Sequence, residues 1–329
     1  MFEAKNLFKT YLVKEKKHFL SLRSKKIAIE AVKGVDISIE KGKIIGLLGI
    51  NGAGKTTTIK MLTTMISPTS GTIVVDGVDA IKNDISVKKI INVITGGERN
   101  IYWRLTATEN LEYFGSLYGI PKTILKGRIQ EILKLVGLLE AKDLPVERYS
   151  KGMKQRLQIA RGLINDPEYI FLDEPTLGLD VVIAKELRSY VKKLASSNKG
   201  ILLTTHYMLE AEELCDYIYI IDSGKIVDKG TPFEVMSKYS RVTATELYVN
   251  YIPNSIAENL NIVDGVEEII VDKENCVIEI KNKNINLIDI LAIVNKYEDV
   301  QVFKIMEKEP SLEESIIKAV AKFNKTEVS

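Results

Sequence analysis

Short apolar runs alternate with segments of helical spacing from Phe2 to about Ser240. The runs IIGLL, TIVVDG, YIFLD and ILLTT are rich in β-branched residues and lead into turn residues, as expected for strands. Parallel strands need a crossover connection, so strands separated by helices predict an α/β domain with a mainly parallel sheet covered on both faces. The run YIYIIDSGKIVDKG predicts a hairpin that turns at Ser223-Gly224.

Between Thr106 and Leu163 the apolar residues recur at helical spacing, with no strand-like run among them. This pattern predicts a helical subdomain, residues 98–165, inserted into the first domain. Its expected apolar stripes are Leu111, Phe114 and Leu117/Tyr118, followed by Ile129, Ile132, Leu133 and Val136.

Past Ser240 the pattern changes. The order strand, helix, hairpin, helix, strand predicts a small α+β domain of the ferredoxin-like βαββαβ type over residues 241–329. A last helix should begin near Ser311, where Ser311 and Glu314 have the spacing of a capping box. The other elements are expected at residues 246–251, 253–260, 267–271, 276–280, 287–297 and 300–305.

The composition of the chain limits the classes of function that it can have. The chain has 329 residues, which suits two domains, residues 1–240 and 241–329. Its 46 basic and 44 acidic residues nearly cancel, so no nucleic-acid partner is expected. Two cysteines and two histidines can build neither a disulfide framework nor a zinc site, which fits a reducing cytosol. No apolar segment is long enough to span a bilayer, so any membrane role is expected to be peripheral.

The segment GINGAGKTT follows the predicted strand IIGLL directly. A strand, a glycine-rich turn and a Lys-Thr pair that opens a helix form a phosphate site. Backbone N–H groups would surround the β-phosphate, Lys55 would reach the β and γ oxygens, and the Thr56 hydroxyl would ligate Mg²⁺. The chain is therefore predicted to bind a nucleoside triphosphate. The predicted binding residues are Gly49, Asn51, Gly52, Ala53, Gly54, Lys55, Thr56 and Thr57.

Two further segments suit the chemistry of phosphate transfer. In YIFLDEP a buried strand runs into two acids, of which Asp173 would hold Mg²⁺ through water and Glu174 would orient or deprotonate the attacking water. In YSKGMKQRLQIARGL, Ser150 and Gly152 stand at the start of a basic amphipathic helix, whose exposed N–H groups and dipole suit a phosphate.

The order of these motifs resembles the ATP-binding subunit of ABC transporters, a P-loop NTPase whose fold includes an antiparallel β-subdomain. SKGMKQ resembles the family's signature loop, with Lys151 in place of the usual glycine, and GLD, ending at Asp180, resembles the loop that crosses the dimer interface. TTH would supply a switch histidine, His206, that contacts the γ-phosphate. Tyr11 stands where the family stacks an aromatic ring on adenine. Without the resemblance, His206 would read as a hydrogen-bonded structural residue, and Tyr11 could equally belong to the core or the surface.

One motif departs from the family pattern. The glutamine that is expected to ligate Mg²⁺ and sense the membrane partner aligns with Gly97. Glu98 is adjacent and is the candidate replacement as a metal ligand. EPSLEES, residues 309–315, and ERNIYWRL, residues 98–105, resemble segments of export ATPases.

The resemblance implies an ATPase that uses ATP and Mg²⁺. Two copies, or one copy and a close relative, would close around two ATP molecules and drive export through separately encoded transmembrane subunits at the cytoplasmic face of the membrane. The alternative is a soluble ABC-type ATPase acting on ribosomes or nucleic acid. Such proteins carry two ATPase domains or long coiled coils, and this sequence shows one ATPase domain and no sustained heptads. The C-terminal domain could regulate the transporter or close the dimer.

Overall fold

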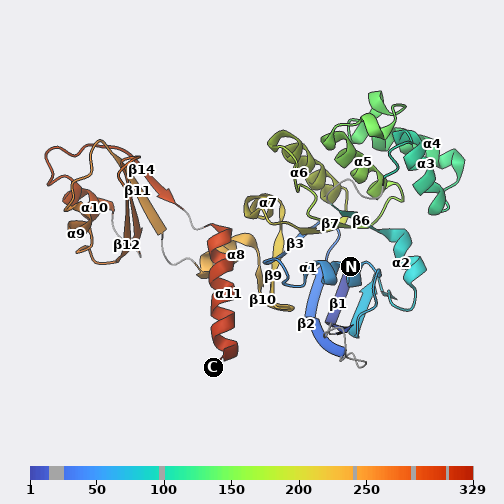
Figure 1. Cartoon of the computed structure of the whole chain (residues 1–329), viewed down its shortest axis with the longest axis horizontal. Coiled ribbons are helices and arrows are strands. Elements are labelled where there is room, and N and C mark those ends of the chain that lie inside the picture. The colour runs from blue at the N-terminus through green and yellow to red at the C-terminus, as the bar shows by residue number, and fades with distance from the viewer. Residues whose placement is uncertain (15–25, 96–100, 240–242, 283–286, 309–310, 329) are drawn as a thin grey trace, which may run out of the picture. The chain divides into compact units, whose positions relative to one another are not determined.

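The computed structural model describes residues 1–14, 26–95, 101–239, 243–282, 287–308 and 311–328 (Figure 1). The chain forms two compact units, Met1–Pro232 and Phe233–Ser329. Helix α8 (Pro232–Tyr239) therefore falls almost entirely in the second unit, a few residues before the boundary expected at residue 240. Within the described ranges, no helix combines the length and the apolar character needed to cross a membrane.

A mainly parallel sheet forms the centre of the first unit, as the sequence predicts. Its strand order is β10-β9-β3-β8-β7-β6, and only the pair of β9 and β10 is antiparallel. Every residue of β3 and β8 is buried, as expected for strands covered on both faces. The strands are β3 (Ile44–Leu48), β6 (Ile91–Thr95), β7 (Tyr169–Asp173), β8 (Gly200–Thr204), β9 (Tyr217–Asp222) and β10 (Lys225–Gly230).

An antiparallel sheet with the order β2-β1-β4-β5 forms the second layer of this unit. The run TIVVDG lies in it as β4, so its expected place in the parallel sheet is wrong, because it pairs antiparallel with β1. The two sheets share one core, in which the Phe2 ring lies edge-on to Phe171 at 5.4 Å. The strands are β1 (Phe2–Lys14), β2 (Lys26–Ile39), β4 (Ser70–Val75) and β5 (Val78–Asp79).

The predicted helical subdomain is present, and residues 101–163 contain no strand. Thr106 begins α3 with a capping box to Glu109, as described for helix N-termini. Leu111 and Leu133 are buried. Of the two residues expected at the next stripe position, Tyr118 is partly buried and Leu117 is 66% exposed. The helices are α3 (Ala107–Leu117), α4 (Lys122–Leu135) and α5 (Lys151–Leu163). The remaining helices of the unit are α1 (Lys55–Leu62), α2 (Asp84–Ile90), α6 (Val181–Ser196) and α7 (Met208–Leu214).

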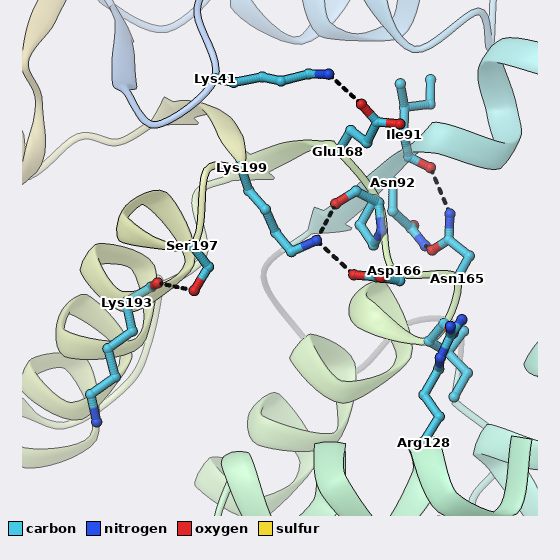
Figure 2. A network of polar contacts seen from close by, with 12 residues as sticks. Lys41, Ile91, Asn92, Arg128, Asn165, Asp166, Glu168, Lys193, Ser197 and Lys199 are labelled. Atoms are coloured by element: carbon cyan, nitrogen blue, oxygen red, sulfur yellow. Dashed lines mark hydrogen bonds and ion pairs between the residues drawn. The ribbon is translucent and has the colours of Figure 1, made fainter. Parts of the chain in front are cut away.

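A polar network holds the turn between α5 and β7 (Figure 2). The Asn165 amide donates to the Ile91 carbonyl at 3.2 Å and accepts from the Asn92 amide at 2.7 Å. The Lys199 ammonium donates to Asp166 at 2.7 Å, and Lys41 pairs with Glu168. These contacts fix the start of β7, the strand that ends at the two predicted acids.

The second unit has the predicted βαββαβ order. Its antiparallel sheet, β12-β13-β11-β14, places the first strand between the third and the fourth, as in ferredoxin-like domains. Leu247, Ile256 and Ile290 meet in its core. Ser311 accepts a hydrogen bond from the Glu314 N–H, as its capping spacing predicts. The elements are β11 (Thr243–Val249), α9 (Ile256–Leu260), β12 (Val266–Asp272), β13 (Val277–Asn282), α10 (Leu287–Val294), β14 (Val302–Lys308) and α11 (Leu312–Val328).

Candidate functional site

The glycine-rich turn lies between β3 and α1 and passes close to neighbouring backbone. A Cβ atom on Gly49 would lie 2.2 Å from the Ile221 carbonyl oxygen, and one on Gly54 would lie 2.8 Å from that of Ala31. Gly54 also has a φ of 111°, which favours glycine. The turn therefore needs glycine at these positions, and it leads directly into the N-terminus of α1, where free N–H groups favour an anion.

A cavity of about 170 Å³ opens beside this turn. The Lys55 ammonium is buried and donates to the carbonyl oxygens of Gly49, at 2.6 Å, and Ile50, at 3.1 Å. Burial lowers the pKa of Lys55, while the charges of Glu174 and Asp173 act in the opposite direction. A cation at a helix N-terminus suits a phosphate group. The cavity is lined by Ala31, Asn51, Gly52, Gly54, Lys55, Thr56, Thr57 and Glu174.

The two predicted acids have different surroundings. Asp173 ends β7, and its Oδ1 accepts a hydrogen bond of 2.7 Å from the Thr204 hydroxyl on β8. Glu174 follows with a φ of 52°, a left-handed conformation that is uncommon for residues other than glycine. Its N–H donates to the Thr204 carbonyl at 3.0 Å. The strand pairing therefore holds a strained turn that directs Glu174 into the cavity, as is common at functional sites.

His206 stands two residues after the end of β8. Its Nε2 atom lies 2.5 Å from Glu174 Oε1. About a third of the His206 side chain and a quarter of the Glu174 side chain are exposed. The pair is therefore accessible beside the cavity, where it can orient a water molecule and an oxygen of a phosphate group.

Two of the residues predicted to touch a partner's nucleotide, Ser150 and Asp180, are the N-caps of helices in this chain. Ser150 Oγ accepts from the Met153 N–H at the start of α5, and Asp180 Oδ1 accepts from the Ile183 N–H at the start of α6. Gly152 is buried, and a Cβ atom there would lie 2.1 Å from Ile183 Cδ1. All three residues are described by the structure, and none of them lines the cavity beside the glycine-rich turn, called the phosphate cavity below.

Two predicted residues have a less defined place. Tyr11 lies on β1 opposite Ile29, and the Lys9 ammonium is 5.4 Å from its ring centroid. Tyr11 does not line the cavity, although Ala31, two residues beyond Ile29, does. Glu98 and its neighbour Gly97 lie outside the described residues.

Sequence reasoning missed the hydroxyl groups and one acid around the site. Thr204 and Thr205 are buried beside His206, and Thr176 is buried two residues after Glu174. Glu210 on α7 is only 3% exposed and accepts a hydrogen bond of 3.1 Å from Thr176. Its position next to Ala211, on the buried face of α7, is the feature from which its burial could have been predicted.

The oxygen donors near the cavity fit a magnesium ion. No cluster of three or more His, Cys, Asp or Glu side chains suited to a metal occurs in the parts of the chain that the structure describes. Magnesium does not need such a cage, since it keeps several waters and takes phosphate oxygens with one or two protein ligands. The Thr56 hydroxyl and the Asp173 carboxylate are hard oxygen donors of this kind.

Comparisons with known proteins agree with this geometry. A family model described as "ABC transporter" matches residues 32–177. The ABC transporter ATP-binding protein NatA of Bacillus subtilis is 43% identical over 208 residues, which cover 63% of this chain and 85% of NatA. The Nod factor export ATP-binding protein I of Ralstonia nicotianae is 37% identical over 222 residues, which cover 68% of this chain and 69% of the relative.

A solved structure supports the fold and the reaction class. The ATP-binding cassette MJ0796, as a post-hydrolysis dimer with ADP and phosphate, superposes with a TM-score of 0.61 at 25% identity. The match covers 70% of this chain and 98% of that structure. With a relative matched over 85% of its length at 43% identity, the chain belongs to the ATP-binding proteins of ABC transporters, a family of ATPases.

Proposed function

We propose that this protein powers export through separately encoded transmembrane subunits, by closing with a second ATPase subunit around two ATP molecules. The observation that carries this proposal is the division of the site. The phosphate cavity is lined by the glycine-rich turn and Glu174, whereas Ser150 and Asp180 cap helices outside it. A second chain that brings its own Ser150 and Asp180 to the cavity would complete the site.

Exposed apolar side chains support a partner at this surface. Val181 and Val182 begin α6 beside Asp180 and are 81% and 68% exposed, and Leu177 in the preceding turn is 49% exposed. Apolar surface of this kind is typical of protein interfaces. MJ0796, which the chain resembles, is a dimer in its post-hydrolysis state.

The chemistry of the proposed site follows from its charges. Lys55 would neutralise phosphate charge, Glu174 would orient or deprotonate the attacking water, and His206 would hold Glu174 and the γ-phosphate in place. Thr56 and Asp173 would hold Mg²⁺, which supplies further charge neutralisation when bound. ATP binding would favour the closed dimer, and hydrolysis would open it.

Two observations favour export as the process that opening and closing of the dimer would drive. The relative from Ralstonia nicotianae is named an export protein, and EPSLEES resembles the tail of export ATPases. We infer a peripheral position on the cytoplasmic face of the membrane, beside transmembrane subunits. Adenine stacking on Tyr11, metal ligation by Glu98, a two-domain division near residue 240 and a regulatory role of the second domain also remain proposals.

Sedimentation of the full chain tests the proposed dimer. Glu174→Gln should sediment as a monomer without nucleotide and as a dimer with Mg²⁺ and ATP, because it binds ATP without hydrolysing it. ADP should leave it monomeric. A monomer at saturating ATP would contradict closure between two copies. A membrane protein encoded by an adjacent gene should change the ATPase activity of this chain when the two are co-purified in detergent. Unchanged activity would contradict the transport role.

A further inference from the structure

Three consecutive residues at the end of β8 each lie beside a different carboxylate. Thr204 Oγ1 donates to Asp173 at 2.7 Å, and His206 Nε2 lies 2.5 Å from Glu174. Thr205, between them, lies beside the Glu210 carboxylate, whose pKa it lowers, and its Oγ1 accepts a hydrogen bond of 3.0 Å from the Tyr207 N–H. Asp173 and Glu174 have roles in the proposed reaction, but Glu210 does not line the phosphate cavity. Its place in this series needs a separate explanation.

Glu210 joins the two segments that carry the site. Its Oε2 accepts a hydrogen bond of 3.1 Å from Thr176, and its N–H donates to the Tyr207 carbonyl at 3.0 Å. Thr176 lies two residues after Glu174, and Tyr207 follows His206 directly. Glu210 therefore bonds to the chain on both sides of the Glu174–His206 contact, through its carboxylate and through its N–H.

Packing alone does not explain an acid at this position. Glu210, Thr176 and Thr205 are at most 4% exposed. Burial of a carboxylate is unfavourable unless it is hydrogen-bonded or paired, whereas an apolar side chain of similar size would fill the space without that penalty. Burial raises the pKa of Glu210, opposed by the hydrogen bonds from Thr205 and Thr176 and by the charge of Arg188. The hydrogen bonds of the Glu210 carboxylate must therefore have a role other than filling space in the core.

We propose that Glu210 is a positioning residue for ATP hydrolysis, which keeps Glu174 and His206 in contact by bonding to Thr176 from the helix that follows His206. It touches no substrate atom and acts through the two segments that it joins. Loss of its hydrogen bonds allows the segments to shift independently, and a shift of about 1 Å at a reacting group can slow a reaction by about 100-fold.

The test is Glu210→Leu in the full chain, with Glu213→Leu as the matched control. Glu213 lies on the same helix and pairs with Lys192 and Arg188 at the surface. Leucine has a similar size but cannot accept the bond from Thr176. Glu210→Leu should lower kcat by about 10- to 100-fold while KM for ATP and the Kd of ATP stay within about twofold, because the phosphate cavity is unchanged. The control should keep the wild-type kcat. A wild-type kcat in Glu210→Leu would overturn the proposal.

A double-mutant cycle separates positioning from a general loss of stability. If Glu210 acts through His206, then adding Glu210→Leu to His206→Ala should lower the single-turnover rate by less than about twofold. A further loss as large as in the wild-type background would overturn the positioning role.

A single hydroxyl deletion tests the same link if Glu210→Leu fails to fold. Thr176→Val removes the bond to the carboxylate, and Thr176→Ser keeps it. Thr176→Val should lower kcat without changing KM, and Thr176→Ser should restore it. Equal rates for the two variants would overturn the proposal.

Discussion

His206 Nε2 lies 2.5 Å from Glu174 Oε1, and this contact joins the ends of two neighbouring parallel strands. The register of β7 and β8 sets Asp173 opposite Thr204, so the residues that follow them meet above the same edge of the sheet. A histidine and a glutamate 32 positions apart in the sequence are therefore brought into contact.

Glu174→Gln should abolish most ATP hydrolysis and keep ATP binding. The amide has nearly the same shape but cannot take a proton from water, so kcat should fall by at least about 100-fold. Phosphate release under saturating ATP measures the rate, and equilibrium binding of a fluorescent ATP analogue measures the affinity. Glu140→Gln, at an exposed position in the helical subdomain, is the control. Unchanged turnover in Glu174→Gln would remove Glu174 from the role of base.

Thr204→Val should raise the Mg²⁺ concentration needed for hydrolysis. Thr204 is fully buried, and its hydroxyl fixes one oxygen of Asp173. Loss of a bond that orients a metal ligand typically weakens metal affinity or activity by about 10- to 100-fold. Thr204→Ser retains the hydroxyl and should behave as the wild type in a Mg²⁺ titration of the ATPase rate. Identical titrations for Val and Ser would show that this bond does not support the metal site.

Gly152→Ala should separate a packing effect from a nucleotide effect. The new methyl group would lie 2.1 Å from Ile183 Cδ1, so overpacking should destabilise the fold by about 1–3 kcal/mol. Adding Ile183→Ala makes room and should restore the thermal midpoint. If Gly152 also touches the partner's nucleotide, ATP-dependent dimerisation should stay weak in the double variant. Full recovery of dimerisation would limit Gly152 to a packing role.

Asp76→Asn should change how stability depends on acid pH. Burial alone would raise the pKa of Asp76, but hydrogen bonds from the N-terminal amine, the Tyr169 hydroxyl and Lys41 outweigh it and lower the pKa from 3.8 to about 2. A depressed carboxyl pKa stabilises the fold above pH 3.8 and loses that effect as the pH falls toward 2. Urea unfolding at several pH values should show the wild type more stable than Asp76→Asn at neutral pH, with the difference shrinking over this window. A difference that does not vary with pH would contradict the assignment.

The sequence was sufficient for features that depend on local order. The position of GINGAGKTT after an apolar strand, and of Asp173 and Glu174 at the end of another, predicted the glycine-rich turn and the two acids as candidate site residues, because each motif is contiguous in the sequence. The βαββαβ order of the second unit also follows from local periodicity. Periodicity did not assign TIVVDG to the correct sheet, since a β-branched run is compatible with either kind of pairing.

Strand pairing decided what local order could not. The Thr204–Asp173 bond depends on the register of β7 and β8, and the burial of Glu210 depends on how α7 packs beneath the turn after Glu174. No sequence spacing predicts these two contacts, because each joins segments about 30 residues apart through the sheet and the helices that cover it. The sequence by itself determined which groups are candidates to bind the nucleotide and react. The tertiary structure decided which buried hydroxyls and which additional carboxylate lie against those groups, because these contacts depend on strand register and helix packing.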